Sequence, residues 1–340
     1  MEGPGKTCPP GSGQPTVDIK KDNTEANQRS HRLEARCLHA KSETVNILSE
    51  DKRSAVIAAL CEGVSLRTVS RLHNVHRDTA TRLSVAVGQG CTAVHGKLMV
   101  NLQVNRLELD EVWSFVKKKR RTVAADDPDT VGDQYIHLAM DSTSKAILSW
   151  LVGKRNYRNA QRFVDDVRFR VLGNPEICTD GYTPYLKAID LAFDGAASHG
   201  IVDKQTVFVA GDGESDSYYA RERLVAVKRV TVSGAPRHIS TSYVERQNLT
   251  LRMSQRRLTR LSNGFSKKYE NHCAAIALYA THYNFCRVHE TLRITPAMHL
   301  GITDHVWTMS ELIEAALSKG AQMQVKRVQA EFRVLKGGKQ

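Results

Sequence analysis

The order of the apolar segments between residues 106 and 209 constrains the fold more than any other feature of this sequence. Strand-like patterns, apolar and short, are expected over 106–117, 135–152, 175–179 and 201–209. The second of these predicts two strands around the turn at 141–144. Helical spacing is expected over 159–172, 183–193, 242–261 and 266–287. The predicted order is therefore three strands, helix, strand, helix, strand and then helices.

This order is that of a ribonuclease-H-like fold, an α/β architecture in which a mixed sheet has flanking helices on both faces. We expect such a domain over 100–300, with an insertion at about 210–238. In this fold the first and fourth strands are neighbours at the centre of the sheet.

A different pattern precedes the strands and predicts a three-helix domain over 45–95. Ser49 is a candidate cap for the first helix, Ser65 precedes the second, and the third is expected from Arg77 to a stop by Gly88. Three short helices with a tight turn before the third are typical of a helix-turn-helix. Its third helix would present these residues to the major groove of DNA: His76, Arg77, Asp78, Thr81 and Arg82. A small helical subdomain without a nucleic-acid partner is the alternative.

Composition indicates a polyanion as partner. Lys and Arg number 49 against 36 Asp and Glu, a formal charge of +13. The seven cysteines form no CxxC pair, so neither a zinc ribbon nor a disulfide framework is indicated. No apolar run is long enough for a membrane helix, and none at the start fits a secretory signal, so we expect a cytoplasmic protein that makes no contact with membranes.

The two ends of the chain differ from its middle. Residues 1–44 are polar, contain few aromatic residues and have Pro and Gly near their start, which predicts a disordered extension. Residues 301–340 are expected to form a C-terminal helical basic tail.

Three acids are candidate catalytic and metal-binding residues. Asp110 lies within an apolar strand, Asp180 at the end of another, and Glu245 early in a long helix. The predicted fold brings Asp110 and Asp180 together, and a following helix can bring Glu245 over them. Three converging carboxylates repel one another and favour a pair of hard divalent cations, Mg²⁺ or Mn²⁺, which suit phosphoryl transfer.

Each acid also has a structural alternative. Asp110 can be the partner of a nearby Arg, with Glu111 beside it as the true ligand. Asp180 can simply start a turn with Gly181, and Glu245 can be an ordinary acid in the first turn of a helix.

Basic residues follow Glu245 and are candidates for contact with the phosphate backbone. Arg252 and Arg256 share its face if the helix continues, and the full predicted set is Arg252, Arg256, Arg257 and Arg260. A solvated basic face is the alternative.

Two further clusters are less specific. The basic run 117–121 is either a phosphate contact or a charged strand end. His282, Cys286 and His289 have the spacing of metal ligands on one helix face, but core packing is the favoured interpretation.

Long segments of the chain resemble bacterial insertion-sequence transposases of the DDE class, specifically the insertion-sequence-one family. The resembling segments, from about residue 45 to about residue 305, are NILSEDKRSAVIAAL, LELDEVWSFV, TDGYTPYL, HISTSYVERQNLTLRMSQRRLTRLSNGFSKKYENH and YNFCRVHETLRITPAMHLGITDHVW. The resemblance implies a DDE triad at Asp110, Asp180 and Glu245, with Arg252 as a basic residue two helical turns after the Glu. It also implies contacts to DNA ends from Asn284, Arg287 and His289.

The activity expected from this resemblance is Mg²⁺-dependent cleavage and strand transfer at the terminal inverted repeats of an insertion sequence. The partners would be double-stranded DNA, both the repeats and the target, and further copies of the chain, because two ends must be joined. The protein would be associated with the nucleoid. The alternative function is that of a catalytically decayed transposase or a helix-turn-helix DNA-binding regulator.

Overall fold

A mixed six-stranded sheet forms the centre of the computed structural model, which describes residues 48–209, 221–259 and 263–325. Its strands are β2 (Arg106–Val116), β3 (Gly132–Asp141), β4 (Ile147–Gly153), β6 (Glu176–Asp180), β7 (Ser198–Val209) and β8 (Arg221–Ser233), in the order β4-β3-β2-β6-β7-β8. β2, β6 and β7 run parallel, and the other pairings within this sheet are antiparallel. This arrangement is consistent with a ribonuclease-H-like fold, as the order of segments predicts.

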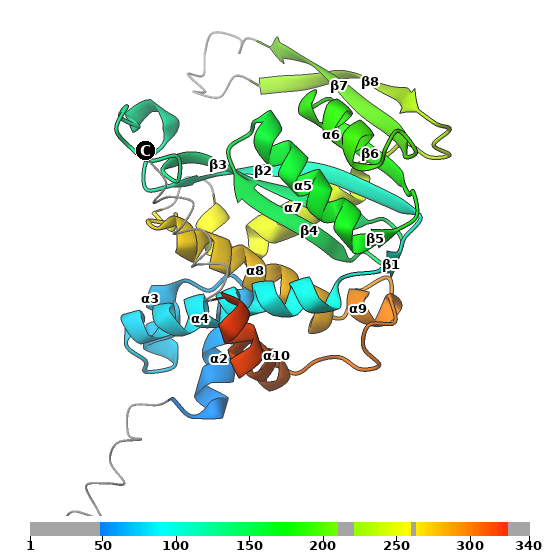
Figure 1. Ribbon diagram of the computed structural model, residues 1–340. Helices are drawn as coiled ribbons and strands as arrows, with labels where there is room; N and C mark the ends of the chain where they lie inside the picture. Colours follow the sequence, from blue (N-terminus) through cyan, green and yellow to red (C-terminus); the bar gives the residue numbers. More distant parts are fainter. Residues whose placement is uncertain (1–47, 210–220, 260–262, 326–340) are drawn as a thin grey trace, which may run out of the picture. The chain divides into compact units, whose positions relative to one another are not determined.

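Helices cover both faces of this sheet (Figure 1). One face carries α5 (Tyr157–Arg170) and α6 (Pro184–Ala192), and the other carries α7 (Ser242–Ser254) and α8 (Tyr269–Phe285). Side chains of a strand alternate between faces, so Leu107 and Leu109 of β2 pack with α5 and α6, whereas Val112 packs with α7 and α8. Smaller elements are β1 (Leu102–Gln103), which pairs with β5 (Val171–Leu172), and the 3₁₀ turn η2 (Arg120–Thr122).

Three helices precede the sheet, as the sequence predicts: α2 (Glu50–Cys61), α3 (Leu66–Leu72) and α4 (Arg77–Leu98). Ser65 caps α3 by accepting a hydrogen bond from the Thr68 amide, at 3.1 Å. The helices are not isolated from the rest of the chain. Ile57 of α2 and Val87 of α4 share a core cluster with Leu278 of α8.

The prediction that the third helix stops by Gly88 is wrong, because α4 continues to Leu98 and thus past the expected domain boundary at residue 95. Gly88 and Gly90 serve close packing instead of termination. A Cβ at Gly88 would lie 2.1 Å from the carbonyl oxygen of Ala274 in α8, and one at Gly90 would lie 1.9 Å from that of Ala316. The missing side chains therefore let α4 approach its neighbours closely.

The helix expected over 242–261 is shorter than predicted. α7 ends at Ser254, Gln255 is extended (φ −119°, ψ 99°), and the 3₁₀ turn η3 (Arg256–Leu258) follows. Leu251 and Leu258 are both buried, which is what one continuous amphipathic helix would also produce. Hydrophobic spacing alone therefore does not reveal the break.

Part of the expected insertion at about 210–238 forms a strand. β8 pairs antiparallel with β7 from His199↔Ser233 to Val209↔Arg221 and becomes the edge of the sheet. Residues 210–220 lie outside the described part of the chain, as do the expected extension 1–44 and the end of the expected basic tail, 326–340.

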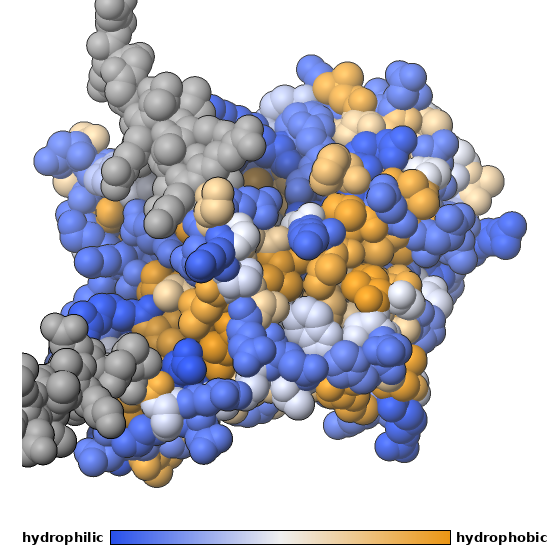
Figure 2. Space-filling view, turned by 60° about the horizontal axis from the view of Figure 1, so that its bottom comes forward, coloured by the Kyte–Doolittle hydropathy of each residue, from blue (hydrophilic) through white to orange (hydrophobic). Residues whose placement is uncertain are grey.

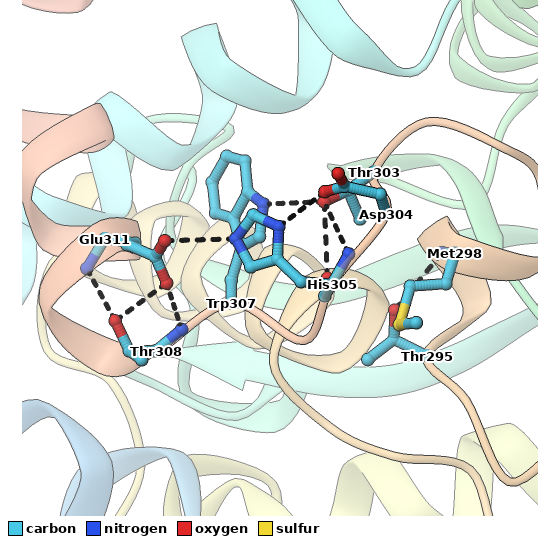
Figure 3. Close-up of polar contacts among 8 residues, drawn as sticks. All are labelled: Thr295, Met298, Thr303, Asp304, His305, Trp307, Thr308 and Glu311. Atoms are coloured by element: carbon cyan, nitrogen blue, oxygen red, sulfur yellow. Dashed lines mark hydrogen bonds and ion pairs between the residues drawn. The ribbon is translucent and has the colours of Figure 1, made fainter.

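The segment after α8 packs onto the molecule through α9 (Pro296–His299) and α10 (Met309–Leu317). Thr308 and Glu311 form a capping box at the start of α10, and His305 lies between Asp304 and Glu311 at 2.7 and 3.0 Å (Figure 3). The Leu312 side chain of α10 is buried in the cluster shared with α2 and α4.

The face of the molecule that lies at the bottom of Figure 1 is brought forward in Figure 2, which shows apolar residues among hydrophilic ones. Among the described residues, none of the helices combines the length and the apolar character that crossing a membrane requires.

Candidate metal centre and nucleic-acid interface

The register of β2 and β6 brings two of the predicted acids together. These strands are parallel, and their last paired residues are Leu109 and Thr179. Asp110 and Asp180 each follow directly, so the two carboxylates lie side by side where β6 ends. β2 continues to Val116, where it still pairs with β3 and no longer with β6, which leaves an open place beside β2 at the end of β6.

Glu111 completes a cluster with these two residues. One carboxylate oxygen from each of Asp110, Glu111 and Asp180 lies within 4.8 Å of the others. All three residues are half-buried as a whole, and the side chain of Glu111 is buried. Within the described ranges it is the only such group of three or more potential ligands, and His282, Cys286 and His289 form none. The alternative of Glu111 as a ligand beside Asp110 is therefore compatible with this geometry.

Hydrogen bonds hold the Asp110 carboxylate in place. Its Oδ1 accepts from the Glu111 amide and its Oδ2 from the Asn248 side-chain amide of α7, both at 2.8 Å. Burial and the negative charge of Asp180 raise the pKa of Asp110 to about 6. A positive charge close to Asp110 would therefore stabilise the ionised form of its carboxylate.

Glu111 and Asp180 share one guanidinium. Arg155, in the turn between β4 and α5, donates from Nε to Glu111 Oε1 at 2.5 Å, and its terminal nitrogen lies 3.9 Å from Asp180 Oδ2. Despite this partner, burial and the charge of Asp180 raise the pKa of Glu111 to about 7. The other oxygen, Glu111 Oε2, is buried and has no hydrogen-bond partner in the described structure.

Glu245, the third predicted acid, lies beside the cluster and not within it. Its two oxygens contact Lys204 Nζ of β7 and Thr241 Oγ1, each at 2.5 Å. Its negative charge nevertheless contributes to raising the pKa of both Asp110 and Asp180. The structure thus brings the three predicted acids into one region but places Glu111, not Glu245, in the tightest group.

Glu108, which is not among the residues predicted from the sequence, holds α7 over the sheet. Its Oε2 accepts hydrogen bonds from the amides of Tyr243 and Val244, at 2.8 and 3.0 Å, in the first turn of α7. Glu108 and Asp110 face the same side of β2, so one strand both anchors this helix and meets its Asn248. The alternation of Glu108 and Asp110 in an apolar strand was the signal available in the sequence.

The donor set fits a hard divalent cation. All ligating atoms in the cluster are carboxylate oxygens, which suit Mg²⁺ or Mn²⁺ better than zinc. The unpartnered Glu111 Oε2 and the raised pKa values of Asp110 and Glu111 both indicate unsatisfied negative charge. A metal ion held here would give Glu111 Oε2 a partner and would lower the pKa values of Asp110 and Glu111.

Residues predicted to contact DNA at α4 lie at its exposed start. His76, Arg77 and Arg82 are exposed, and Thr81 is half-buried, with its hydroxyl donating to the Arg77 carbonyl at 2.9 Å. A hollow of about 290 Å³ opens beside them, lined by Arg67, Ser70, Arg71, His76 and Arg77. None of its lining residues is acidic, and three of them are arginines, although the exposed Asp78 carboxylate lies 3.6 Å from Arg77 Nε.

The basic residues after Glu245 do not form the predicted stripe. Arg252 belongs to α7 and is half-buried, but Arg256 lies in η3 beyond the end of that helix, so the two do not share one helical face. Arg257 donates to Ser266 Oγ at 3.2 Å, and burial lowers its pKa. Arg257 is half-buried, so only part of its side chain is accessible to DNA, and Arg260 lies outside the described residues.

Asn284, expected from the resemblance to contact DNA ends, is fully buried. It accepts from the Ile147 amide at 2.9 Å and donates to the Ile147 carbonyl at 2.7 Å, which joins α8 to β4. Its role in the described structure is to satisfy backbone groups of the sheet.

The raised pKa of Glu111 predicts a pH-dependent stability. Between its ordinary value of 4.5 and about 7, the folded chain binds a proton that the unfolded chain releases, so this residue makes the fold less stable as pH rises. Buried His95, His137 and His272, whose pKa values are lowered to about 3, 4 and 4, act in the opposite sense. A comparison with Glu111→Gln isolates the carboxylate from these histidines.

We therefore expect the stability of Glu111→Gln relative to the unsubstituted protein to increase by about 2 kcal/mol between pH 5 and pH 8. The measurement is urea unfolding in EDTA at both pH values. Equal pH dependence in the two proteins would show that Glu111 is not held in an unfavourable charged state.

No protein-family model and no curated protein sequence matches this chain. Its membership of a transposase family therefore stays a prediction from the segments quoted above. What the chain does has to be inferred from the arrangement of the carboxylates, the basic surfaces and the resemblance together.

Proposed function

We propose that this chain is a DDE-class transposase that binds the terminal inverted repeats of an insertion sequence and catalyses metal-dependent DNA cleavage and strand transfer. The observation that carries the proposal is the parallel register of β2 and β6, which sets Asp110 and Asp180 side by side. The proposed fold has two parts: the helix-turn-helix of α2–α4 and the ribonuclease-H-like sheet with its helices.

In this proposal Asp110, Asp180 and Glu245 are the catalytic carboxylates, with Glu111 next to them. A pair of Mg²⁺ or Mn²⁺ ions bound there would supply activation of a water or 3′-hydroxyl and stabilisation of the leaving oxygen. Asn248 orients Asp110 through its hydrogen bond, and Glu108 keeps α7 in the position from which Asn248 reaches the site. These contacts preorganise the carboxylates.

DNA binding is assigned to the start of α4 and the basic hollow beside it. The residues that would contact bases in the major groove are His76, Arg77, Thr81 and Arg82. A phosphate of the DNA backbone would bind in the hollow, where Arg67 and Arg71 of α3 would donate hydrogen bonds to it. Neither Arg67 nor Arg71 has an ion pair among the described residues, and both are exposed, so both are available to a phosphate. Arg252 and Arg256 remain candidates nearer the carboxylates.

Substitution of Arg67 and Arg71 by Gln should weaken binding to duplex DNA with a defined salt signature. Removing one phosphate-binding cation lowers the slope of log affinity against log salt concentration by about 0.9, so the slope for the double variant should fall by about 1–2. Titration of a labelled duplex at several salt concentrations measures this. Lys97→Gln, at the other end of α4 and also exposed, is the matched control and should keep the slope of the unsubstituted protein. An unchanged slope in the double variant would show that the hollow is not part of the DNA interface.

Cleavage of a labelled duplex carrying the terminal inverted repeat tests the proposed activity. We expect nicking in Mg²⁺ and none in EDTA, with the duplex bound in both. Binding without cleavage under either condition would favour the second candidate, a decayed transposase or a helix-turn-helix regulator, for which the basic hollow at α3 and α4 is the favouring observation. Cleavage that persists in EDTA would contradict a metal-dependent mechanism.

A further inference from the structure

Arg155 has an unusual position in relation to the carboxylate cluster. It is the cation that touches two of the three clustered acids, Glu111 and Asp180. It also stacks over the Tyr182 ring, with 4.0 Å from the guanidinium carbon to the ring centroid. Tyr182 in turn donates its amide to Asp180 Oδ1 at 3.0 Å, so one short turn holds both the carboxylate and the platform under Arg155.

The backbone around Arg155 is fixed while its side chain is not enclosed. Lys154 Nζ donates to the carbonyls of Val131 and Asp133 at 2.7 and 3.0 Å, and Asn159 donates its side-chain amide to the Lys154 carbonyl at 2.9 Å. The Arg155 side chain is 40% exposed, compared with 4% for Glu111. The guanidinium can therefore leave the acids by side-chain rotation, with no change in the sheet or in α5.

A guanidinium and a divalent cation compete for these acids. Both are attracted by the same three carboxylates, and each repels the other at this separation. Arg155 already donates to Glu111 Oε1 and lies next to Asp180 Oδ2. A divalent cation that binds these carboxylates must therefore displace the guanidinium or be repelled by its positive charge.

We propose that Arg155 is an internal counter-ion of the carboxylate cluster, which weakens divalent cation binding and leaves Glu111 and Asp180 when a cation binds. This inference rests on the proposed function, because it takes the cluster as the cation site. Arg155 is a positioning residue in this scheme: it keeps the acids together without a metal and limits how readily they accept one.

The test is the affinity of the full-length chain for Mn²⁺, measured by calorimetry at pH 8 without DNA. Arg155→Gln should bind Mn²⁺ at least tenfold tighter than the unsubstituted chain, a gain of about 1.4 kcal/mol or more. Arg155→Lys keeps the charge and should stay close to the unsubstituted chain. Arg158→Gln removes an exposed cation three residues away that touches none of these acids and should change nothing.

Thermal unfolding provides a second readout. Arg155→Gln should unfold at a lower temperature than the unsubstituted chain in EDTA, because Glu111 loses its partner, and should gain more from added Mn²⁺. Tyr182→Leu, which removes the stacking platform but leaves every charge, should also tighten Mn²⁺ binding, by less than Arg155→Gln. This variant keeps the inference testable if Arg155→Gln does not fold.

The outcomes separate this inference from the proposed function. If the unsubstituted chain binds Mn²⁺ and Arg155→Gln binds it equally or more weakly, the counter-ion role is overturned while the metal site stands. If neither protein binds Mn²⁺, the cluster is not a cation site, and both proposals fail.

Discussion

Asp180→Asn is expected to reduce Mg²⁺-dependent nicking of a terminal-repeat duplex by about 10³-fold or more, while duplex binding is retained. The substitution keeps the shape of the side chain and the acceptor for the Tyr182 amide, which bonds Oδ1 at 3.0 Å. It removes one of the charges that would hold the cations at the open place where β6 ends. Loss of cation stabilisation of a developing oxyanion is worth about 4 kcal/mol at this fold-change.

The stability of this variant distinguishes lost chemistry from lost folding. Burial and the charge of Glu245 raise the pKa of Asp180, which means that its ionised form is disfavoured in the folded chain. Asp180→Asn should therefore not lower the unfolding temperature in EDTA. Functional sites commonly hold like charges close together at a cost in stability, and removing one of them relieves the repulsion. Asp190→Asn, an exposed acid on the helix that follows, serves as the matched control and should retain full nicking. Nicking by Asp180→Asn at the rate of the unsubstituted protein would exclude the proposed triad.

Strand order was enough to predict that Asp110 and Asp180 come into one region, because it makes β2 and β6 neighbours at the centre of the sheet. It was not enough to predict the composition of the cluster. That composition depends on where β6 stops relative to β2, which leaves Glu111 beside Asp180 although it points away from Asp110 in an ideal strand. Arg155 and Asn248 come from distant turns and helices, and no local pattern marks them.

The same limit explains the errors in helix length. A glycine at position 88 predicts a helix end because glycine commonly ends helices, whereas its actual constraint is a carbonyl oxygen of α8, which lies far away in the sequence. Similarly, the break after Ser254 preserves the burial of both Leu251 and Leu258, so the hydrophobic pattern is the same with or without it. Local propensity predicted the elements and their order, and tertiary contacts decided their ends.

Gly88→Ala is expected to lower the free energy of unfolding by about 2–4 kcal/mol, although alanine usually stabilises a helix relative to glycine. The new Cβ would lie 2.1 Å from the Ala274 carbonyl oxygen and 2.7 Å from its carbonyl carbon, both backbone atoms that cannot rotate away. α4 and α8 would have to separate, and the cluster that Val87 and Leu278 share would loosen. Urea unfolding followed by circular dichroism measures the change.

Gly96→Ala in the same helix is the matched control, since no atom lies within 4 Å of the Cβ it would add. It should stabilise the protein by about 0.5–1 kcal/mol through helix propensity alone. Opposite signs at two glycines of one helix would establish that α4 is docked on α8 in solution and unfolds together with the sheet. If Gly88→Ala were neutral or stabilising, α2–α4 would move independently of the carboxylate cluster, and DNA bound at α4 would have no fixed position relative to Asp110 and Asp180.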